Sequence, residues 1–361
     1  MSNMTRMDRH RQAEKEKNEK KNKKQVKEQL QGPVPDNDYK SGGGGNIPPK
    51  GTKPPKAKKP KKKRKKTRIF LMVLLVIVIL CTFGYFKGYM ATKMDKNNQQ
   101  PDVGNFVGEK STDGSTNILL LGSDSRGEDQ GRSDTIMIAH YDKKNKQPKI
   151  VSIMRDTFVP IPTKDGVEYN KINAAYAYGG PELVRQTIKQ TFGIPIQYYA
   201  IVNFESFPKI VDTLAPGGLK IDAEKDLEVE GTVIKKGPQK MNGHEALQYA
   251  RFRKDEEGDF GRVRRQQQVM SALVSTSLSP LNAWHIPEAL GKVRGYTQTD
   301  IPFSFYPSAG MNYLFSSHKP LEILTVPVKD TWTDGYYDYA GSVLEIDEGA
   351  NKAAINEFFN K

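Results

Sequence analysis

The sequence predicts an α/β domain whose mixed central sheet is flanked by helices in α-β-α layers, preceded by one transmembrane helix and a disordered basic tail. One supporting observation is an uncharged apolar run that separates a Lys-rich segment from the rest of the chain. Another is the alternation, beyond that run, of short β-branched or apolar runs with segments of helical periodicity. The predicted boundaries are 1–68 for the tail, 69–87 for the transmembrane helix, 88–115 for an extracellular stalk, and 116–361 for the domain, with its motif-bearing core at about 117–275.

The N-terminal tail holds the whole basic excess of the chain. Residues 1–68 carry 23 of the 56 Lys and Arg residues and 7 of the 42 Asp and Glu residues, a net charge of +16 against −2 for the rest. With almost no aromatic residues, such a tail cannot bury enough apolar surface to fold. The slightly acidic remainder gives no reason to expect a nucleic-acid partner. The basic run at 56–68 should instead lie against anionic lipid headgroups.

The predicted membrane helix is the uncharged run IFLMVLLVIVILCTFGYF at 69–86. At about 1.5 Å per residue it spans roughly 27 Å, close to the hydrocarbon thickness of a bilayer. The alternatives are a buried core helix and a cleaved signal peptide, but a signal peptide lies nearer the N-terminus and ends in small residues. The positive-inside rule predicts a single-pass protein of the cell membrane, with a cytoplasmic N-terminus and an extracellular C-terminal domain.

The only cysteine, Cys81, falls in this apolar run. The predicted external domain therefore has no disulfide and no thiolate metal site, as a domain large enough to bury a real core allows.

Secondary-structure elements follow from residue periodicity. Strands are predicted at 117–122, 134–142, 149–154 and 198–204, with further strands in 216–240 and 318–328. Helices are predicted at 181–192, 205–214, 243–251, 260–279 and 351–359. Strands that alternate with helices indicate a layered α/β domain.

Two carboxylates flank the turn between the first two predicted strands. Asp124 follows the first strand, and Asp134 opens the second, two residues after Arg132. Carboxylates at neighbouring strand ends can meet at one sheet edge, where they suit Mg²⁺ or Mn²⁺ bound together with a phosphate. Because Asp and Ser are also common in turns and caps, ordinary loop chemistry is the alternative.

Arginines mark two more positions. Arg155 follows the third predicted strand, at a strand end where open α/β sheets bind ligands, although a surface pair with Asp156 is the simpler interpretation. Five arginines lie within 251–265, and of these Arg262 shares a helix face with Gln266. Arginine suits bidentate phosphate recognition, so this segment predicts a polyanion or pyrophosphate site, with a solvated basic helix face as the alternative.

These motifs together resemble the LytR-CpsA-Psr family of Gram-positive cell-envelope proteins. The stretches that carry the resemblance, in family order, are NILLLGSDSR, GRSDTIMI, VSIMRDT, YNKINAAYAYGG, FGIPIQYYAIVNFESFPKIVD, LAPGG, NGHEALQYARFRK and GDFGRVRRQQQ. Met154 departs from the family pattern, since many relatives are expected to carry Pro there.

The resemblance implies an Mg²⁺-dependent phosphotransferase that moves an anionic glycopolymer, such as wall teichoic acid, from a polyprenyl-pyrophosphate carrier to a peptidoglycan sugar hydroxyl. It implies Asp124 and Asp134 as ligands of Mg²⁺ (or Mn²⁺), and it implies catalytic roles for them and for Arg155, Arg251 and Arg262. It places the pyrophosphate against Arg132, Arg155, Lys171, Arg251, Arg253, Arg262, Arg265 and Gln266, with Asp259 at a patterned position of uncertain role. The prenyl chain would lie among apolar residues between sheet and helices.

Two alternatives remain open at this stage. The same residues could serve a non-catalytic polyprenyl-phosphate-binding sensor or transcription attenuator. Water in place of the sugar hydroxyl would make the protein a polyprenyl-pyrophosphate hydrolase. Direct regulation of DNA by the basic tail is a weak third hypothesis, because the tail has no recognition-helix pattern. The sequence names no general base, since a carboxylate bound to Mg²⁺ is a poor base.

Overall fold

The computed structural model describes residues 63–96, 98, 103–123, 133–142, 147–277, 282, 284–305 and 320–361. The predicted disordered tail therefore falls outside the described residues up to 62. Its last six residues, 63–68, belong to the first turns of the following helix instead.

Helix α2 (Lys63–Lys93) contains the predicted membrane segment. Among the described residues it is the one helix long and apolar enough to cross a membrane, which is consistent with a single-pass membrane protein. Its apolar side chains face outward, as the exposure of Ile69, Leu75 and Phe83 illustrates. With 31 residues it is about 46 Å long, more than the hydrocarbon layer requires.

The C-terminal turns of α2 pack against α7 (Ile286–Tyr296) through glycine. A Cβ on Gly88 would overlap the carbonyl oxygen of Glu288, and one on Gly291 would overlap that of Tyr85. Lys87 also forms a 2.8 Å ion pair with Glu288. Residues 88–93, expected as a loop-like stalk, are thus helical because they have a packing partner.

The later part of the expected stalk also lies on the domain. Val103 and Phe106 pack against the main core, and the backbone N–H of Glu109 donates to the carbonyl of Ile196. The first part of the described segment 103–115 therefore packs against the domain.

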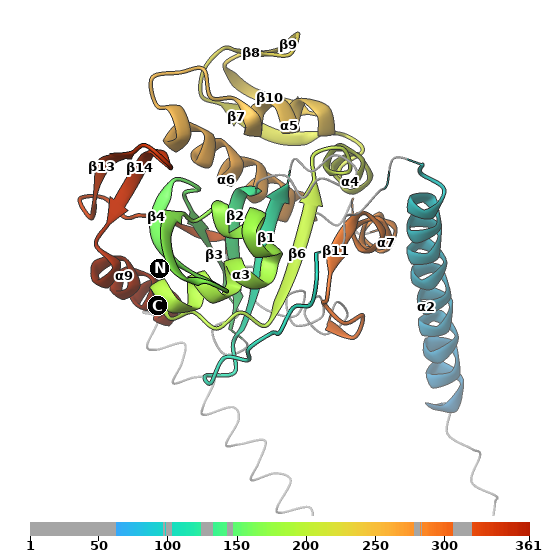
Figure 1. Cartoon of the computed structure of the whole chain (residues 1–361). Coiled ribbons are helices and arrows are strands. Elements are labelled where there is room, and N and C mark those ends of the chain that lie inside the picture. The colour runs from blue at the N-terminus through green and yellow to red at the C-terminus, as the bar shows by residue number, and fades with distance from the viewer. Residues whose placement is uncertain are drawn as a thin grey trace, which may run out of the picture. The chain divides into compact units, whose positions relative to one another are not determined.

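The centre of the domain is a six-stranded mixed sheet in the order β11-β6-β1-β2-β3-β12 (Figure 1). The strands are β1 (Thr116–Ser123), β2 (Ser133–Tyr141), β3 (Pro148–Ile153), β6 (Tyr198–Asn203), β11 (Thr297–Thr299) and β12 (Glu322–Val326). The β1–β6 and β3–β12 pairs are parallel and the other pairs antiparallel. The predicted mixed α/β fold is confirmed.

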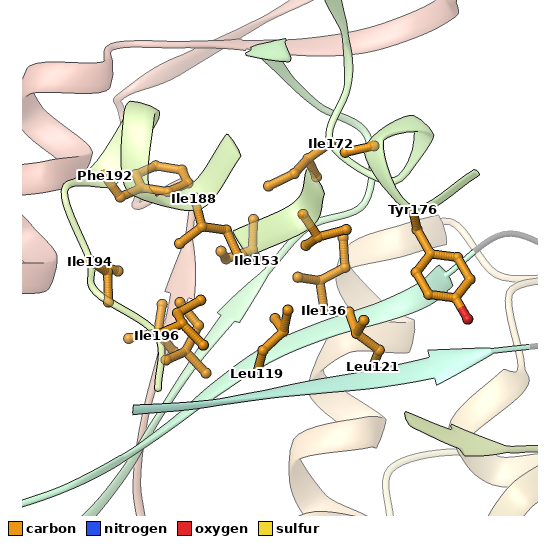
Figure 2. Packing of buried hydrophobic residues seen from close by; sticks show 14 of the residues in the cluster. Leu119, Leu121, Ile136, Ile153, Ile172, Tyr176, Ile188, Phe192, Ile194 and Ile196 are labelled. Atoms are coloured by element: carbon orange, nitrogen blue, oxygen red, sulfur yellow. The ribbon is translucent and has the colours of Figure 1, made fainter. Parts of the chain in front are cut away.

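Helices cover both faces of this sheet. Helix α3 (Ala174–Phe192) and helix α9 (Glu348–Asn360) lie on one face, where they share a core with β1, β2 and β3. That core includes Leu119, Ile136, Ile188 and Phe192, as Figure 2 shows. The side chains of β1 alternate between the two faces, so Leu119 and Leu121 point to α3 while Leu120 points away.

The opposite face carries α6 (Gly258–Ser277), which is joined to the sheet by a 2.8 Å hydrogen bond from Gln267 Nε2 to Thr325 Oγ1. Behind it, α4 (Phe207–Leu214) and α5 (Gly243–Arg251) share a second core with a ribbon of β7 (Leu219–Ala223) and β10 (Gly237–Met241). A small hairpin of β8 (Leu227–Val229) and β9 (Thr232–Ile234) extends this subregion.

A second, peripheral sheet has the order β13-β14-β4-β5. It consists of β4 (Thr157–Thr163), β5 (Gly166–Lys171), β13 (Trp332–Tyr337) and β14 (Gly341–Ile346), none of which was predicted. Because β4 starts four residues after β3 ends, this sheet begins beside the C-terminal end of β3.

Candidate active site

The candidate site starts from a contact between strands. Asp134 is the second residue of β2, and Arg155 lies two residues beyond β3. Since β2 and β3 are antiparallel, the start of one and the end of the other share a sheet edge. There Arg155 Nη1 donates a 2.7 Å hydrogen bond to Asp134 Oδ1. Two motifs that are 21 residues apart in sequence therefore meet.

The first turns of α6 add a second arginine and a second carboxylate. Arg262 Nη2 lies 2.6 Å from Asp259 Oδ1, and Arg262 Nη1 lies 3.8 Å from Asp134 Oδ1. Asp259 Oδ1 is also 3.6 Å from Arg155 Nε. Arg262 is only 1% exposed, although its side chain is among the largest and most polar in the chain. A buried charge of this kind is retained only where it is paired.

Two more cations border this pair of arginines. Arg253, in the loop between α5 and α6, places Nη2 3.0 Å from Asp134 Oδ2. Lys171, the last residue of β5, places Nζ 3.0 Å from Asp156 Oδ1, and Asp156 Oδ2 lies 3.4 Å from Arg155 Nε. We call the set Asp134, Arg155, Asp156, Lys171, Arg253, Asp259 and Arg262 the charged cluster.

Burial and charge have opposing effects on the pKa values of Asp134 and Arg262. Burial disfavours ionisation of Asp134, but the hydrogen bond from Arg155 and the nearby charges of Arg253 and Arg262 outweigh it and lower the pKa of this carboxyl. Burial lowers the pKa of Arg262 to about 10, against the opposing charge of Asp259. Asp134 and Arg262 therefore both remain ionised at neutral pH.

Several hydrogen-bond donors of the charged cluster have no acceptor among the described residues. Nε and Nη1 of Arg262 and Nε of Arg155 are buried, and none of them makes a hydrogen bond within the described part of the chain. Buried N–H groups without acceptors are costly, and phosphate oxygens are acceptors that match guanidinium geometry. The arrangement therefore suits a phosphate-bearing anion.

Three other predicted residues have partners outside the charged cluster. Arg251, the last residue of α5, stacks on Phe204 with 5.0 Å from Cζ to the ring centroid. Gln266 Nε2 lies 3.5 Å from the carbonyl of Ala250. Arg265 is fully buried and donates to Asp255 at 2.9 Å and to a backbone carbonyl at 2.8 Å. Arg265 thus holds the 252–255 loop, which carries Arg253, and its buried Nε makes no hydrogen bond among the described residues.

The predicted metal ligands can be compared with the structure only at Asp134. Asp124 and Arg132 lie outside the described residues, and both carboxylate oxygens of Asp134 contact arginines. Among the described residues no group of three or more His, Cys, Asp or Glu side chains could hold a metal ion. Of the two predicted ligands, the described residues thus include only Asp134, and one carboxylate by itself does not make a site for Mg²⁺.

The ion pair between Lys171 and Asp156 was not predicted from the sequence. The connection comes from the β4–β5 hairpin, in which Lys171 is paired with Phe158, two residues after Asp156. The dipeptide Asp165-Gly166 between two β-compatible runs is a hairpin signal that could have found it.

Comparisons with known proteins show the family of the chain. Residues 82–355 match the model of the LytR_cpsA_psr family, and the chain belongs to this family. It is 41% identical over 285 residues to the regulatory protein MsrR of Staphylococcus aureus, covering 79% of this chain and 86% of that one. It is 38% identical over 211 residues to the polyisoprenyl-teichoic acid–peptidoglycan teichoic acid transferase TagU of Bacillus anthracis, covering 58% and 66%.

The fold of this chain is also similar to that of a solved structure. The crystal structure of TagV from B. subtilis superimposes with a TM-score of 0.59 at 29% identity, covering 70% of this chain and 99% of that chain.

Proposed function

We propose that this protein is a phosphotransferase that moves an anionic glycopolymer from a polyprenyl-pyrophosphate carrier to a sugar hydroxyl of peptidoglycan. The observation that carries the proposal is the charged cluster, in which buried guanidinium N–H groups have no acceptor among the described residues. The similarity to TagU, whose name states a polyisoprenyl-linked donor and a peptidoglycan acceptor, supports the same reaction class.

The donor's pyrophosphate would lie on Arg155, Arg253 and Arg262. Attack by a sugar hydroxyl on the phosphorus next to the polymer displaces polyprenyl phosphate, and negative charge builds up on the bridging oxygen. Fixed guanidinium groups stabilise that charge without reorganising, and their effect is strongest where burial lowers the local dielectric constant. Arg262 is placed for this role because it is nearly inaccessible to water. The pyrophosphate bond itself supplies the driving free energy, so no nucleotide triphosphate is needed.

The prenyl chain would lie on the α6 side of the central sheet. Across the strands, the pairing register puts Leu120, Met137 and Ser152 on this face beside Thr325, which α6 contacts. Several neighbours are small, as at Ala200 and Ala139, and Leu120 is only half-buried. A cavity of about 700 Å³ lies at the edge of this face, and its lining combines apolar residues such as Ala272, Leu321 and Ile323 with polar ones such as Lys220, Arg264 and Gln267. Small side chains beneath a helix leave room for an aliphatic guest.

Mg²⁺ is part of the proposal and would neutralise the pyrophosphate when bound. Asp134 would hold it together with Asp124, the partner predicted from the sequence. The location proposed is the outer surface of the cell membrane, since a lipid-linked donor requires a site close to the leaflet. The contact of α2 with α7 supports this placement, because it fixes the domain to the end of the membrane helix.

A regulatory role is the second candidate, and the similarity to MsrR favours it. In that case the charged cluster would bind polyprenyl phosphate without turning it over. Binding of polyprenyl phosphate would then provide acceptors for the guanidinium N–H groups of the charged cluster.

Turnover by the full-length protein in detergent distinguishes these functions. The substrates are polyprenyl-pyrophosphate-linked teichoic acid and peptidoglycan, and the products measured are polyprenyl phosphate and polymer-bearing peptidoglycan. Arg253→Ala should lower transfer about 100-fold, as loss of one charge-stabilising donor does. Arg185→Ala is the control, because Arg185 pairs with Glu182 on α3, on the other side of the sheet. Lipid binding without any product would establish the sensor, and release of polymer to water alone would establish the hydrolase.

A further inference from the structure

The outer face of the peripheral sheet carries a group of aromatic side chains. Phe158 on β4 stacks on Tyr337 of β13 with ring centroids 4.6 Å apart and planes at 11°. Tyr169 on β5 lies 5.8 Å from Phe158, and Tyr339 lies 5.7 Å from Tyr337. We call Phe158, Tyr169, Tyr337 and Tyr339 the aromatic platform.

The aromatic platform is exposed but held in place. Tyr169 is 51% and Tyr339 63% exposed, although aromatic rings of this size normally bury most of their surface. The Tyr337 hydroxyl donates a 2.7 Å hydrogen bond to Glu345, and the Tyr339 hydroxyl donates at 3.1 Å to the backbone of Tyr169. Rings that are fixed before a ligand arrives lose little side-chain entropy on binding.

The rings surround a shallow hollow of about 380 Å³ that also contains carboxylates. Its lining includes Glu345 and Glu348 beside the four aromatic residues. Ring faces attract the C–H face of a sugar, and carboxylates accept hydrogen bonds from sugar hydroxyl and amide groups. An anionic polymer would be repelled by the same carboxylates. The chemistry of the hollow therefore fits an uncharged glycan.

The strand register connects the aromatic platform with the charged cluster. Phe158 is the Cα partner of Lys171 on β5 and of Glu345 on β14, so these three side chains share one face of the sheet. Lys171 in turn forms an ion pair with Asp156, next to Arg155. A ligand on the platform would thus extend toward the charged cluster.

We propose that the aromatic platform is the binding site for the glycan strand of the acceptor, a β-linked chain of N-acetylated amino sugars. The proposal rests on the transferase function above, because it assigns one of the two substrates of that reaction to a surface. The anionic donor would bind to the arginines of the charged cluster, and the uncharged glycan would bind to the aromatic platform. The two substrates then approach the reacting phosphate from different sides.

Glycan binding can be measured with the full-length protein in detergent. The probes are chitohexaose, in a titration of tyrosine fluorescence, and peptidoglycan sacculi stripped of anionic polymer, in co-sedimentation. Substituting Tyr169→Ala and Tyr339→Ala together should weaken chitohexaose binding about tenfold, the loss expected for two stacking contacts. The matched control is Tyr336→Ala, because Tyr336 is 71% exposed and is the neighbour of Tyr337 on β13, so its side chain points to the other face.

The outcomes separate this proposal from the proposed function. The double variant should keep the wild-type affinity for the polyprenyl-pyrophosphate donor and lose transfer to the acceptor. Tyr339→Phe in place of Tyr339→Ala, which keeps the aromatic ring, should restore chitohexaose binding. Equal binding of both probes by the double variant and the wild type would overturn the glycan site, whatever the enzyme does with its donor. Glycan binding that depends on the platform, in a wild-type protein that never transfers polymer, would support the site and overturn the transferase.

Discussion

Arg262 and Asp259 form a buried ion pair within the first turns of α6, with 2.6 Å between Nη2 and Oδ1. Their three-residue spacing sets them on neighbouring positions of one helix face. Asp259 also approaches Arg155 at 3.6 Å, so one carboxylate contacts two arginines, one within α6 and one just after β3. This carboxylate is what allows the cationic site to exist when no anionic ligand is bound.

Removal of that charge should therefore destabilise the protein. Asp259→Asn leaves Arg262 buried with only the more distant Asp134, and breaking such a pair costs about 3 kcal/mol of unfolding free energy. Urea unfolding of the full-length protein in detergent measures the change. Asp226→Asn is the control, because its partner Lys235 is largely exposed and that pair contributes little. Equal stability of both variants would contradict the buried-pair argument.

The contact between α2 and α7 gives a second prediction. Gly291→Ala adds a Cβ that would overlap the carbonyl of Tyr85 on α2, whereas Gly217→Ala meets nothing within 4 Å. Overpacking of this kind costs about 1–3 kcal/mol. We expect Gly291→Ala to lower the thermal unfolding midpoint and to increase proteolysis between α2 and β1. If Gly217→Ala has the same effect, close packing of α2 on α7 is not the cause.

The central sheet was predictable because its strands are buried on both faces. The apolar runs at 117–122, 134–142, 149–154 and 198–204 correspond to β1, β2, β3 and β6 within one or two residues. The peripheral strands β4 and β13 escaped prediction because Pro interrupts the first and Gly the second. Helix α7 was missed since it packs through glycines, which leave no apolar pattern.

The site was predictable where a motif sits at the end of a buried strand. Asp134 and Arg155 are such residues, and they lie together with Arg262. Arg265 was predicted beside the pyrophosphate because the family resemblance implied it. Three residues along a helix from Arg262, it instead reaches Asp255 and the carbonyl of Phe252. Charge density in sequence does not distinguish an arginine that binds a ligand from one that holds a loop.

Metal dependence gives a third prediction. Mg²⁺ together with inorganic pyrophosphate should stabilise the wild-type protein and so raise its unfolding midpoint. At a hundredfold excess of ligand over the dissociation constant, the gain in unfolding free energy is about 2.7 kcal/mol. A chelator should abolish the metal-dependent part of this gain, together with the transfer reaction. Asp124→Asn should lose the metal-dependent part of the gain while keeping the part that pyrophosphate supplies through the arginines. A wild-type gain that is unchanged by chelator would contradict metal binding.

A buried histidine in the central sheet gives the last prediction. His140 on β2 donates a 2.7 Å hydrogen bond from Nδ1 to Asn117 Oδ1, and its ring stacks on Phe359 of α9 at 4.0 Å. Burial lowers the pKa of His140 to about 4, with the charge of Lys149 adding to the effect and those of Asp113 and Asp142 opposing it. The native state thus takes up this proton only at a pH well below the ordinary pKa of 6.5.

The sign of the pH dependence follows from the two states. Between the unfolded pKa of 6.5 and the folded pKa of about 4, the unfolded chain binds a proton that the native chain does not. Stability is therefore full above the upper value and falls as the pH decreases through this window, by about 2 kcal/mol between roughly pH 7.5 and pH 5. Urea unfolding at both pH values measures the loss. His140→Gln removes the titrating group, so the variant should lose less stability over the same interval. The argument fails if the variant and the wild type lose equal amounts, because carboxylates elsewhere would then account for the whole change.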